Sequence, residues 1–561
     1  MVKRFLELLN REVSGLHETA YLLGFFTLLS QILALVRDRF FASTFGAGET
    51  LDIYYSAFRL PDFILISAGS LVSASILIPF LVDRIKHGSG EARRFGNGVF
   101  SGFFFFIVLL SFIAFIFTPW LSKLFFSGFS DEAIVQVSLL TRIMLLQPIF
   151  LGLSNFFASI TQLYGRFFVY AVSPLLYNLG IIVGATALYP RFGLSGLAMG
   201  VVLGAILHFL IQIPVVFRTD LRPSFTFDFK LSELWSVASV SLPRTIALSL
   251  ANLSSLFLLM LGSFLAVGSI AIFNLSWNLQ SVPLAIVGAS YSLAIFPALV
   301  RFFSGGENDK FFLHLVGATR HIIFWSIPAT VLFVVLRAQI VRTILGGSDA
   351  FDWSDTRLTA PTLAFFSLSI TAQGLVLLFT RAFYARGNTT KPLIFNAISA
   401  VLTVCFGFAL LRFFEIYPFW QFFVESVMRV SDIPGTAVLM LPLAYTGAMI
   451  ANAVFFWSAF AKDFSKWNCS VLPTLFHSFS ASVIMGLIAY ILLNVFDNIF
   501  NLNTFIGIFL QGFLSGLGGI TVGIIVLVLM KNDELHEVWL TLHHKIWKAK
   551  VIGVDATETT L

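Results

Sequence analysis

Long apolar segments alternate with short polar ones along almost the whole chain. Most apolar segments are about 20 residues or longer, which is the length that an α-helix needs to cross the hydrocarbon core of a bilayer. Charged or turn-forming residues bound the segments on both sides. About 14 segments are predicted, at residues 20–41, 52–82, 95–119, 133–161, 167–189, 193–217, 234–263, 268–300, 312–343, 357–385, 391–412, 437–461, 471–495 and 503–530. The pattern predicts an all-α polytopic membrane protein with about 14 transmembrane helices.

The segments group into five predicted parts. These are an N-terminal amphipathic segment (1–19), an N-lobe of six spans (20–217), a C-lobe of six spans (231–463), two further spans (471–530) and a cytoplasmic amphipathic tail (531–561). In the tail, Leu535, Trp539, Leu542 and Ile546 recur at helical spacing opposite Lys and His side chains. This spacing is typical of a helix that lies on a membrane surface.

Basic residues concentrate in every second loop, which predicts the orientation. The basic loops contain Arg84, Lys86, Arg93, Arg94, Arg166, Arg218, Arg222, Lys230, Arg301, Lys310, Arg386, Lys391, Lys462 and Lys466. By the positive-inside rule these loops and both termini are expected in the cytoplasm. One predicted outer loop, residues 412–436, is an exception, since it carries Arg412 and Arg429 beside several aromatic residues. We interpret it as a surface-lying amphipathic helix.

Composition narrows the class of protein. The chain is 58% hydrophobic and only 11% charged, and its mean hydropathy is +0.90. These values exclude a disordered chain and a typical soluble enzyme. Two cysteines are too few for a disulfide framework, and the net charge of +6 reflects the basic loops rather than nucleic-acid binding. The sequence has no phosphate-binding glycine loop, paired-His metal motif or nucleophile elbow, so no catalytic residue, metal site, cofactor or enzymatic activity is expected.

The two halves of the chain resemble each other. Gly152, Phe157 and Gly165 match Gly374, Phe379 and Gly387 at one offset, residues 174–178 match 392–396, and residues 78–82 match 296–300. The offset equals about six spans, so both lobes enter the membrane in the same direction. Two such lobes are expected to be related by a pseudo-twofold axis along the membrane normal, an arrangement typical of transporters that bind substrate between repeats.

Ionisable residues within the spans are costly and therefore mark candidate sites. They include Arg37, Asp38, Asp52, Arg59, Arg142, Arg244 and Arg320. The last three have no acidic neighbour within a helical turn, so their partners must come from another helix, from backbone carbonyls or from an anionic ligand. Because cations outnumber acids and guanidinium groups bind phosphate bidentately, the set favours an anionic substrate. Pairing of Arg37 with Asp38 that only holds helices together is an equal alternative.

Several motifs resemble one family. Ser30–Asp38, Phe45–Gly48 and Asp52–Pro61 are similar to the first two helices of the MurJ/MviN lipid II flippases. Arg142 with the residues after it, Arg320 before Pro328, and Phe383–Arg386 resemble its fourth span, its ninth span and its tenth-to-eleventh connection.

The resemblance implies a two-lobed bundle of the multidrug/oligosaccharidyl-lipid/polysaccharide exporter superfamily in the bacterial cytoplasmic membrane. It implies that the protein flips an undecaprenyl-diphosphate-linked peptidoglycan precursor, that its last two helices form a groove for the lipid tail, and that membrane lipids and cell-wall synthesis proteins are partners. By resemblance, Arg37, Asp38, Asp52 and Arg59 occupy cavity positions. Asn278 aligns with a cavity arginine of the family, and residues 65–70 lack the family's charged run.

Three hypotheses follow. The first is a lipid-linked oligosaccharide flippase that works by alternating access, with Arg142, Arg244 or Arg320 compensating for the missing arginines. The second is a cation-coupled exporter of drugs or polysaccharide units, with Asp38 and Asp52 as its ion site. The third is a non-transporting scaffold in cell-wall assembly. The coupling ion is left open.

Overall fold

The computed structural model describes residues 16–228, 230–465 and 467–547, and this part of the chain is helical with no β-strand. The helices of the first half are α2 (Leu16–Phe45), α3 (Glu49–Ala57), α4 (Arg59–Gly69), α5 (Ala74–Lys86), α6 (Ser89–Phe125), α7 (Asp131–Met144), α8 (Leu146–Leu163), α9 (Phe167–Val183), α10 (Tyr189–Phe192), α11 (Leu194–Leu210) and α12 (Ile213–Val216). Those of the second half are α13 (Leu231–Gly262), α14 (Ser269–Pro283), α15 (Ser290–Ser304), α16 (Asn308–Val335), α17 (Arg337–Ile344), α18 (Trp353–Ser367), α19 (Ile370–Ala385), α20 (Thr390–Ile416), α21 (Pro418–Met428), α22 (Met440–Asp463), α23 (Trp467–Asp497), α24 (Phe505–Leu529) and α25 (Asp533–Trp547). Four short 3-10 or π turns, η1 (Ser70–Val72), η2 (Gly184–Leu188), η3 (Leu284–Ala289) and η4 (Thr436–Leu439), lie between them.

Each of the predicted spans coincides with one helix or with a span broken into two or three helices. Among the described residues, ten helices are long and apolar enough to cross a membrane, or eleven if α18 and α19, which meet at a bend of 40°, form one span. The remaining predicted spans are α2, the α3–α5 segment and α13. The three helices of the α3–α5 segment have only 9, 11 and 13 residues, so none of them alone could cross a membrane, and α13 contributes the shorter apolar stretch Ser249–Gly262. The polytopic all-α class is thus confirmed.

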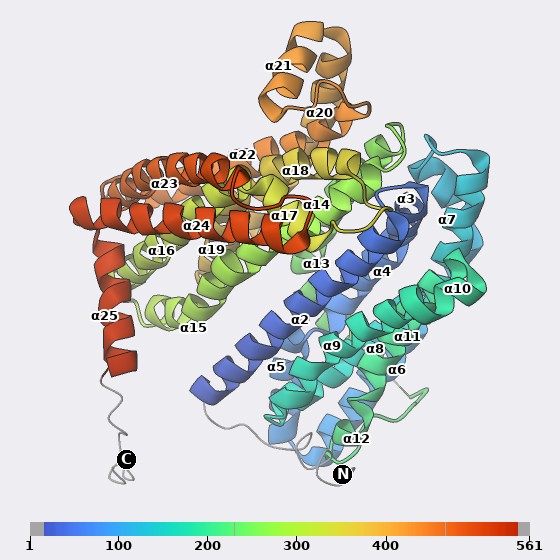
Figure 1. The fold of residues 1–561 in the computed structure, drawn as a ribbon. Coiled ribbons are helices and arrows are strands. Elements are labelled where there is room, and N and C mark those ends of the chain that lie inside the picture. The colour runs from blue at the N-terminus through green and yellow to red at the C-terminus, as the bar shows by residue number, and fades with distance from the viewer. Residues whose placement is uncertain (1–15, 229, 466, 548–561) are drawn as a thin grey trace.

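The three predicted surface segments differ in how much of each the structure describes. Residues 1–15 and 548–561 lie outside the described residues, whereas Asp533–Trp547 of the tail form the helix α25. The predicted helix of the 412–436 loop is α21. It projects with the end of α20 beyond the rest of the bundle (Figure 1), and the side chains of Phe419 and Phe422 are exposed there.

The order of straight and broken helices repeats in the two halves. Each half begins with a long helix (α2, α13), which is followed by a broken span (α3–α5, α14–α15) and a second long helix (α6, α16). A second broken span comes next (α7–α8, α18–α19), and two further spans complete each half (α9 and α11, α20 and α22). The broken spans end at equivalent places, since Lys86 and Ser304 each precede a glycine turn. This order agrees with the internal repeat in the sequence.

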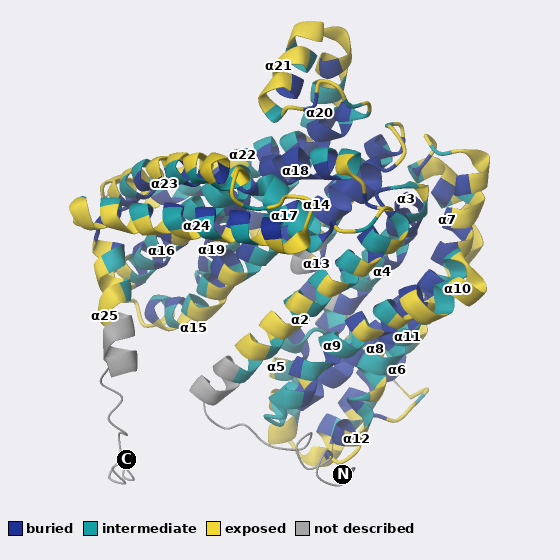
Figure 2. Ribbon diagram, viewed as in Figure 1, coloured by how far each residue is buried: buried dark blue, intermediate teal, exposed yellow. Residues whose placement is uncertain are grey.

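The two lobes share a hydrophobic core at one end of the molecule and have separate cores at the other. The largest cluster of buried apolar side chains combines Leu51 of the N-lobe with Phe273 of the C-lobe. A second cluster, around Phe156, belongs to the N-lobe and the start of α13, and a third, around Phe379, belongs to the second half alone. Accordingly, the lobes meet near α3 and α14 and diverge toward the end where α2 begins and α25 ends (Figure 1). Buried residues are dense at the meeting end (Figure 2).

Candidate functional site

One face of α14 carries the polar contacts between the lobes. The backbone N–H groups of Gly268 and Ala271 and the side chains of Asn274 and Asn278 recur every three or four residues, so they lie on the same side of the helix. Each of them binds a charged side chain of the N-lobe. We call this set the α14 face. It gathers four of the predicted site residues at the junction of the lobes, namely Asp38, Asp52, Arg59 and Asn278.

Arg37 and Asp38 form the polar centre of this junction. The Arg37 guanidinium donates from Nε and Nη2 to Asp38 Oδ1 over 2.9 and 2.8 Å, and from Nη1 to Asn178 Oδ1 over 3.1 Å. The other Asp38 oxygen accepts from Asn278 Nδ2 over 2.9 Å. Asp38 is buried, whereas 18% of the Arg37 side chain is exposed. The pair thus presents its cationic edge outward, and its negative charge is held inside by both lobes.

Arg59 extends the junction along α14. Its Nη2 donates to Asn274 Oδ1, while Nε is buried without a hydrogen-bond partner in the described part of the chain. Asp62, one turn along α4, accepts from Gln147 Nε2 over 3.1 Å. A guanidinium with an unused Nε donor can donate a hydrogen bond to an anionic or carbonyl oxygen without losing its existing contact.

Asp52 caps the beginning of α14 from the opposite lobe. Its two carboxylate oxygens accept from Gly268 N over 2.6 Å and Ala271 N over 2.7 Å. These amides belong to the first turn of α14, where an acidic side chain satisfies unpaired donors and complements the helix dipole. Gly268 has φ +90°, and a Cβ there would lie 1.9 Å from the carbonyl oxygen of Ala47. The cap therefore requires glycine and leaves neither Asp52 oxygen free in this arrangement.

The other predicted residues lie elsewhere. Arg142 lies at the surface between α7 and α6, where Nε donates to the Phe115 carbonyl over 3.3 Å and the guanidinium stands over the Phe115 ring. Arg244 belongs to α13, but its side chain is outside the described residues. The structure therefore brings neither Arg142 nor Arg320 to the Arg37–Asp38 pair.

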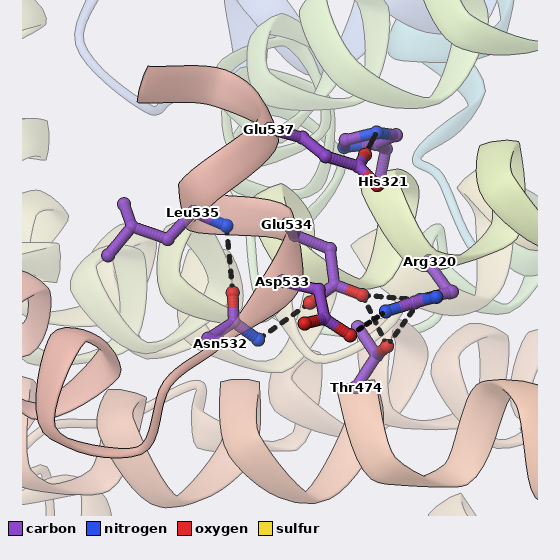
Figure 3. Close-up of polar contacts among 8 residues, drawn as sticks. All are labelled: Arg320, His321, Thr474, Asn532, Asp533, Glu534, Leu535 and Glu537. Carbon is purple, nitrogen blue, oxygen red and sulfur yellow. Dashed lines mark hydrogen bonds and ion pairs between the residues drawn. The ribbon is translucent and has the colours of Figure 1, made fainter. Parts of the chain in front are cut away.

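Arg320 instead joins α16 to the tail helix α25 (Figure 3). Its guanidinium donates to Glu534, to Asp533 Oδ2 over 3.1 Å and to Thr474 Oγ1 over 3.0 Å. Thr474 in turn donates to Glu534 over 2.6 Å. Burial acts to raise the pKa of the Glu534 carboxyl, but the hydrogen bonds from Thr474, the backbone and Arg320 outweigh it and hold that pKa below its usual value. The partner that the sequence required for Arg320 from another helix is thus a pair of carboxylates about 210 residues away.

Replacing Arg320 is expected to release α25. Arg320→Gln would leave the buried Glu534 carboxylate with fewer donors, which costs about 1.5–3 kcal/mol. Amide hydrogen exchange in α25 should then accelerate about 10-fold or more at pH 7. Because the Glu534 pKa is lowered by folding, its stabilising effect is present above its ordinary pKa and is lost as the pH falls through the lowered value. Acid should therefore release α25 of the parent protein as well.

The control for this experiment is Arg84→Gln, which breaks an exposed ion pair with Glu91 away from α25. It should leave exchange in α25 unchanged. Equal protection of α25 in the Arg320→Gln protein would show that this cluster does not hold the tail.

Three uncharged residues of the site were not predicted. They are Asn178, Asn274 and Gln147, each of which contacts a charged candidate. Asn178 had a sequence signal, because it ends the repeated 174–178 motif. The corresponding Asn396 accepts from Asn452 Nδ2 over 3.0 Å in the other lobe.

The geometry also bears on the ion-site hypothesis. All four carboxylate oxygens of Asp38 and Asp52 accept hydrogen bonds from protein donors. Neither carboxylate therefore has an oxygen free for a cation in this arrangement. Among the residues that the structure describes, no group of three or more His, Cys, Asp or Glu side chains is arranged to hold a metal ion. The junction can instead exchange guanidinium and amide hydrogen bonds between protein and ligand oxygens.

Comparisons with known proteins agree with this architecture. The family model described as lipid II flippase MurJ matches residues 41–511. A probable lipid II flippase MurJ of Haemophilus influenzae is 27% identical over 407 residues, which cover 69% of this chain and 79% of the relative. One from Thermotoga maritima is 26% identical over 525 residues, which cover 92% and 97%.

Solved structures show the same fold. The lipid II flippase MurJ in an inward closed conformation aligns with a TM-score of 0.74 at 21% identity, over 92% of this chain and all of that one. An inward-facing multidrug resistance transporter of the MATE family and MOP superfamily aligns with a TM-score of 0.62 at 16% identity, over 78% and 96%. Since the family model covers most of the chain, the protein belongs to the lipid II flippase MurJ family.

Proposed function

We propose that this protein is a lipid II flippase, which moves a lipid-linked glycan headgroup across the bacterial cytoplasmic membrane. The observation that carries the proposal is the family match over residues 41–511 together with two helical lobes joined at one end by the α14 face. Transporters built from repeats place their substrate between the lobes and move the lobes around it. The basic loops lie at the end where the cores are separate, so that end and both termini are proposed to face the cytoplasm.

Arg37 is proposed to bind the pyrophosphate of the headgroup. Its partly exposed guanidinium already lies at the junction and is oriented by Asp38 and Asn178. A planar fork of N–H donors matches the oxygens of a phosphate group. Arg59, with its unused Nε donor, is proposed as a second contact.

When the lobes move, the hydrogen bonds at the α14 face are proposed to break while new contacts between the lobes form at the other end. Opening the joined end would break the bonds of Asp52, Asp38 and Arg59 to α14, while closing the separate end would bury apolar surface there. The bonds to the α14 face set the relative stability of the two states. No covalent chemistry is involved in this cycle.

Complementation tests the proposal directly. Expression in a bacterium depleted of its own MurJ should restore growth and cell shape, because the two proteins would carry the same substrate. Failure to restore growth, in cells where the protein is present in the membrane at normal levels, would contradict the flippase assignment. Sodium- or proton-dependent efflux of cationic dyes would then favour an exporter, and retained binding to wall-synthesis proteins would favour a scaffold.

A further inference from the structure

A cavity lies away from the α14 face, between the C-lobe and the last two spans. It has a volume of about 910 Å³ and is lined by α16, α17, α18, the end of α21, α23 and α24. Three arginines line it, namely Arg337, Arg357 and Arg429. They come from three separate elements that the fold brings together at the end where the lobes are joined.

The backbone and a carboxylate hold two of these arginines in position. Arg357 Nη1 donates to Asp432 Oδ2 over 2.7 Å, and its Nη2 donates both to Asp432 and to the Arg429 carbonyl, the latter over 2.7 Å. Arg429 follows α21 with φ 61°, in the left-handed region. Its Nη2 donates to the Tyr490 hydroxyl of α23 over 3.1 Å. Arg357 therefore fixes the turn from which Arg429 reaches across the cavity.

Arg337 approaches the same cavity from the start of α17. Its Nη1 donates to the Val334 carbonyl over 2.9 Å. Within the described part of the chain, neither Arg337 nor Arg429 forms an ion pair, and the one carboxylate among the lining residues is the exposed Asp497. Two guanidinium groups that share a cavity repel each other unless an anion lies between them.

The walls of the cavity indicate what kind of anion. Val331 and Val334 of α16 and Val483 and Leu487 of α23 line it, and the last two side chains are also exposed on the outer surface of the bundle. Apolar walls beside a cationic end suit a molecule with a charged head and hydrocarbon chains. We infer that this cavity binds the phosphate-bearing headgroup of a membrane lipid between Arg337 and Arg429, with the start of its acyl chains against α16 and α23.

The site gives a role to Arg429, one of the two arginines by which the predicted outer loop 412–436 departs from the positive-inside pattern. The inference goes beyond the proposed function, because binding at this cavity requires no movement of the lobes.

Binding of short-chain lipids to the full-length protein tests the inference. Native mass spectrometry in detergent would compare dioctanoyl phosphatidylglycerol with zwitterionic dioctanoyl phosphatidylcholine. The anionic lipid should bind at least 10-fold more tightly to the parent protein, and Arg337→Gln/Arg429→Gln should remove that preference. The matched control is Arg412→Gln, which removes a charge that is 76% exposed on the same side, outside this cavity, and should change affinity less than 2-fold.

The outcomes distinguish a lipid site from a site for a free anion and test whether the two arginines form it. Inorganic pyrophosphate that binds the parent protein while the anionic lipid does not would show a site for a free anion and overturn the lipid assignment. Unchanged lipid preference in the double variant would overturn the site itself. If the double variant does not fold, the single variant Arg429→Gln, which alters an exposed side chain, replaces it. It should still weaken binding of the anionic lipid about 3-fold, and unchanged binding would contradict the inference.

Discussion

Arg37→Ala is expected to abolish lipid II flipping in reconstituted vesicles. The substitution removes the partly exposed guanidinium at the junction of the lobes and leaves Asp38, which is 1% exposed, with Asn278 as its remaining side-chain donor. Removing one partner of a buried ion pair costs about 3–5 kcal/mol. The measurement is translocation of fluorescent lipid II, beside thermal unfolding of the same preparation.

A second variant separates folding from transport. Arg37→Gln/Asp38→Asn replaces both charges, so it should recover most of the lost stability without recovering flipping. Normal flipping in either variant would contradict the role proposed for Arg37. Recovery of flipping in the double variant alone would show that the pair is structural.

Asp52→Ala is expected to weaken the joined end of the lobes. The carboxylate makes two charge-assisted hydrogen bonds to buried backbone amides of α14, and the loss of such a cap costs about 2–4 kcal/mol. The free energy of unfolding should fall by that amount. Thiol labelling of an introduced Ala47→Cys, at a position that is now 9% exposed, should accelerate because the lobes separate more often.

The control for this change is Asp131→Ala, which removes an exposed carboxylate in the first turn of α7. Its effect on stability should stay below about 0.5 kcal/mol, the usual range for surface positions. A similar small effect of Asp52→Ala would show that the cap does not hold the lobes together.

Much of the fold follows from local pattern in the sequence. Apolar segment length located the spans, and the order of helices in the two halves agrees with the repeat. Prolines within the spans predict some of the breaks, since α14 ends at Pro283. The break between α7 and α8 precedes Pro148, whose missing N–H gives a local reason. The 40° bend between α18 and α19 has no proline at Leu368 or Ser369, so it depends on packing that a sequence window does not contain.

The candidate site was less predictable, because its partners are distant in sequence. Charge in an apolar segment identified Arg37, Asp38 and Arg59, yet Asp52 binds amides more than 200 residues away and Arg320 binds the tail. Neutral amides such as Asn274 cost less free energy to bury in a span than charged groups do, so they do not stand out in the sequence as candidate site residues. Their role depends on the register of α14 against the N-lobe, which only the tertiary structure defines.

Locking the joined end tests the central claim most directly. The Ala47 amide donates to Asp355 Oδ2 across the junction over 3.0 Å, so Ala47→Cys and Asp355→Cys can be bridged by a short reducible cross-linker. The exposed Cys405 and Cys469 would first be replaced by Ser. If the lobes must separate for transport, the cross-linked protein should flip lipid II no faster than protein-free vesicles, and reduction should restore the rate. Flipping at an equal rate before and after reduction would contradict the account.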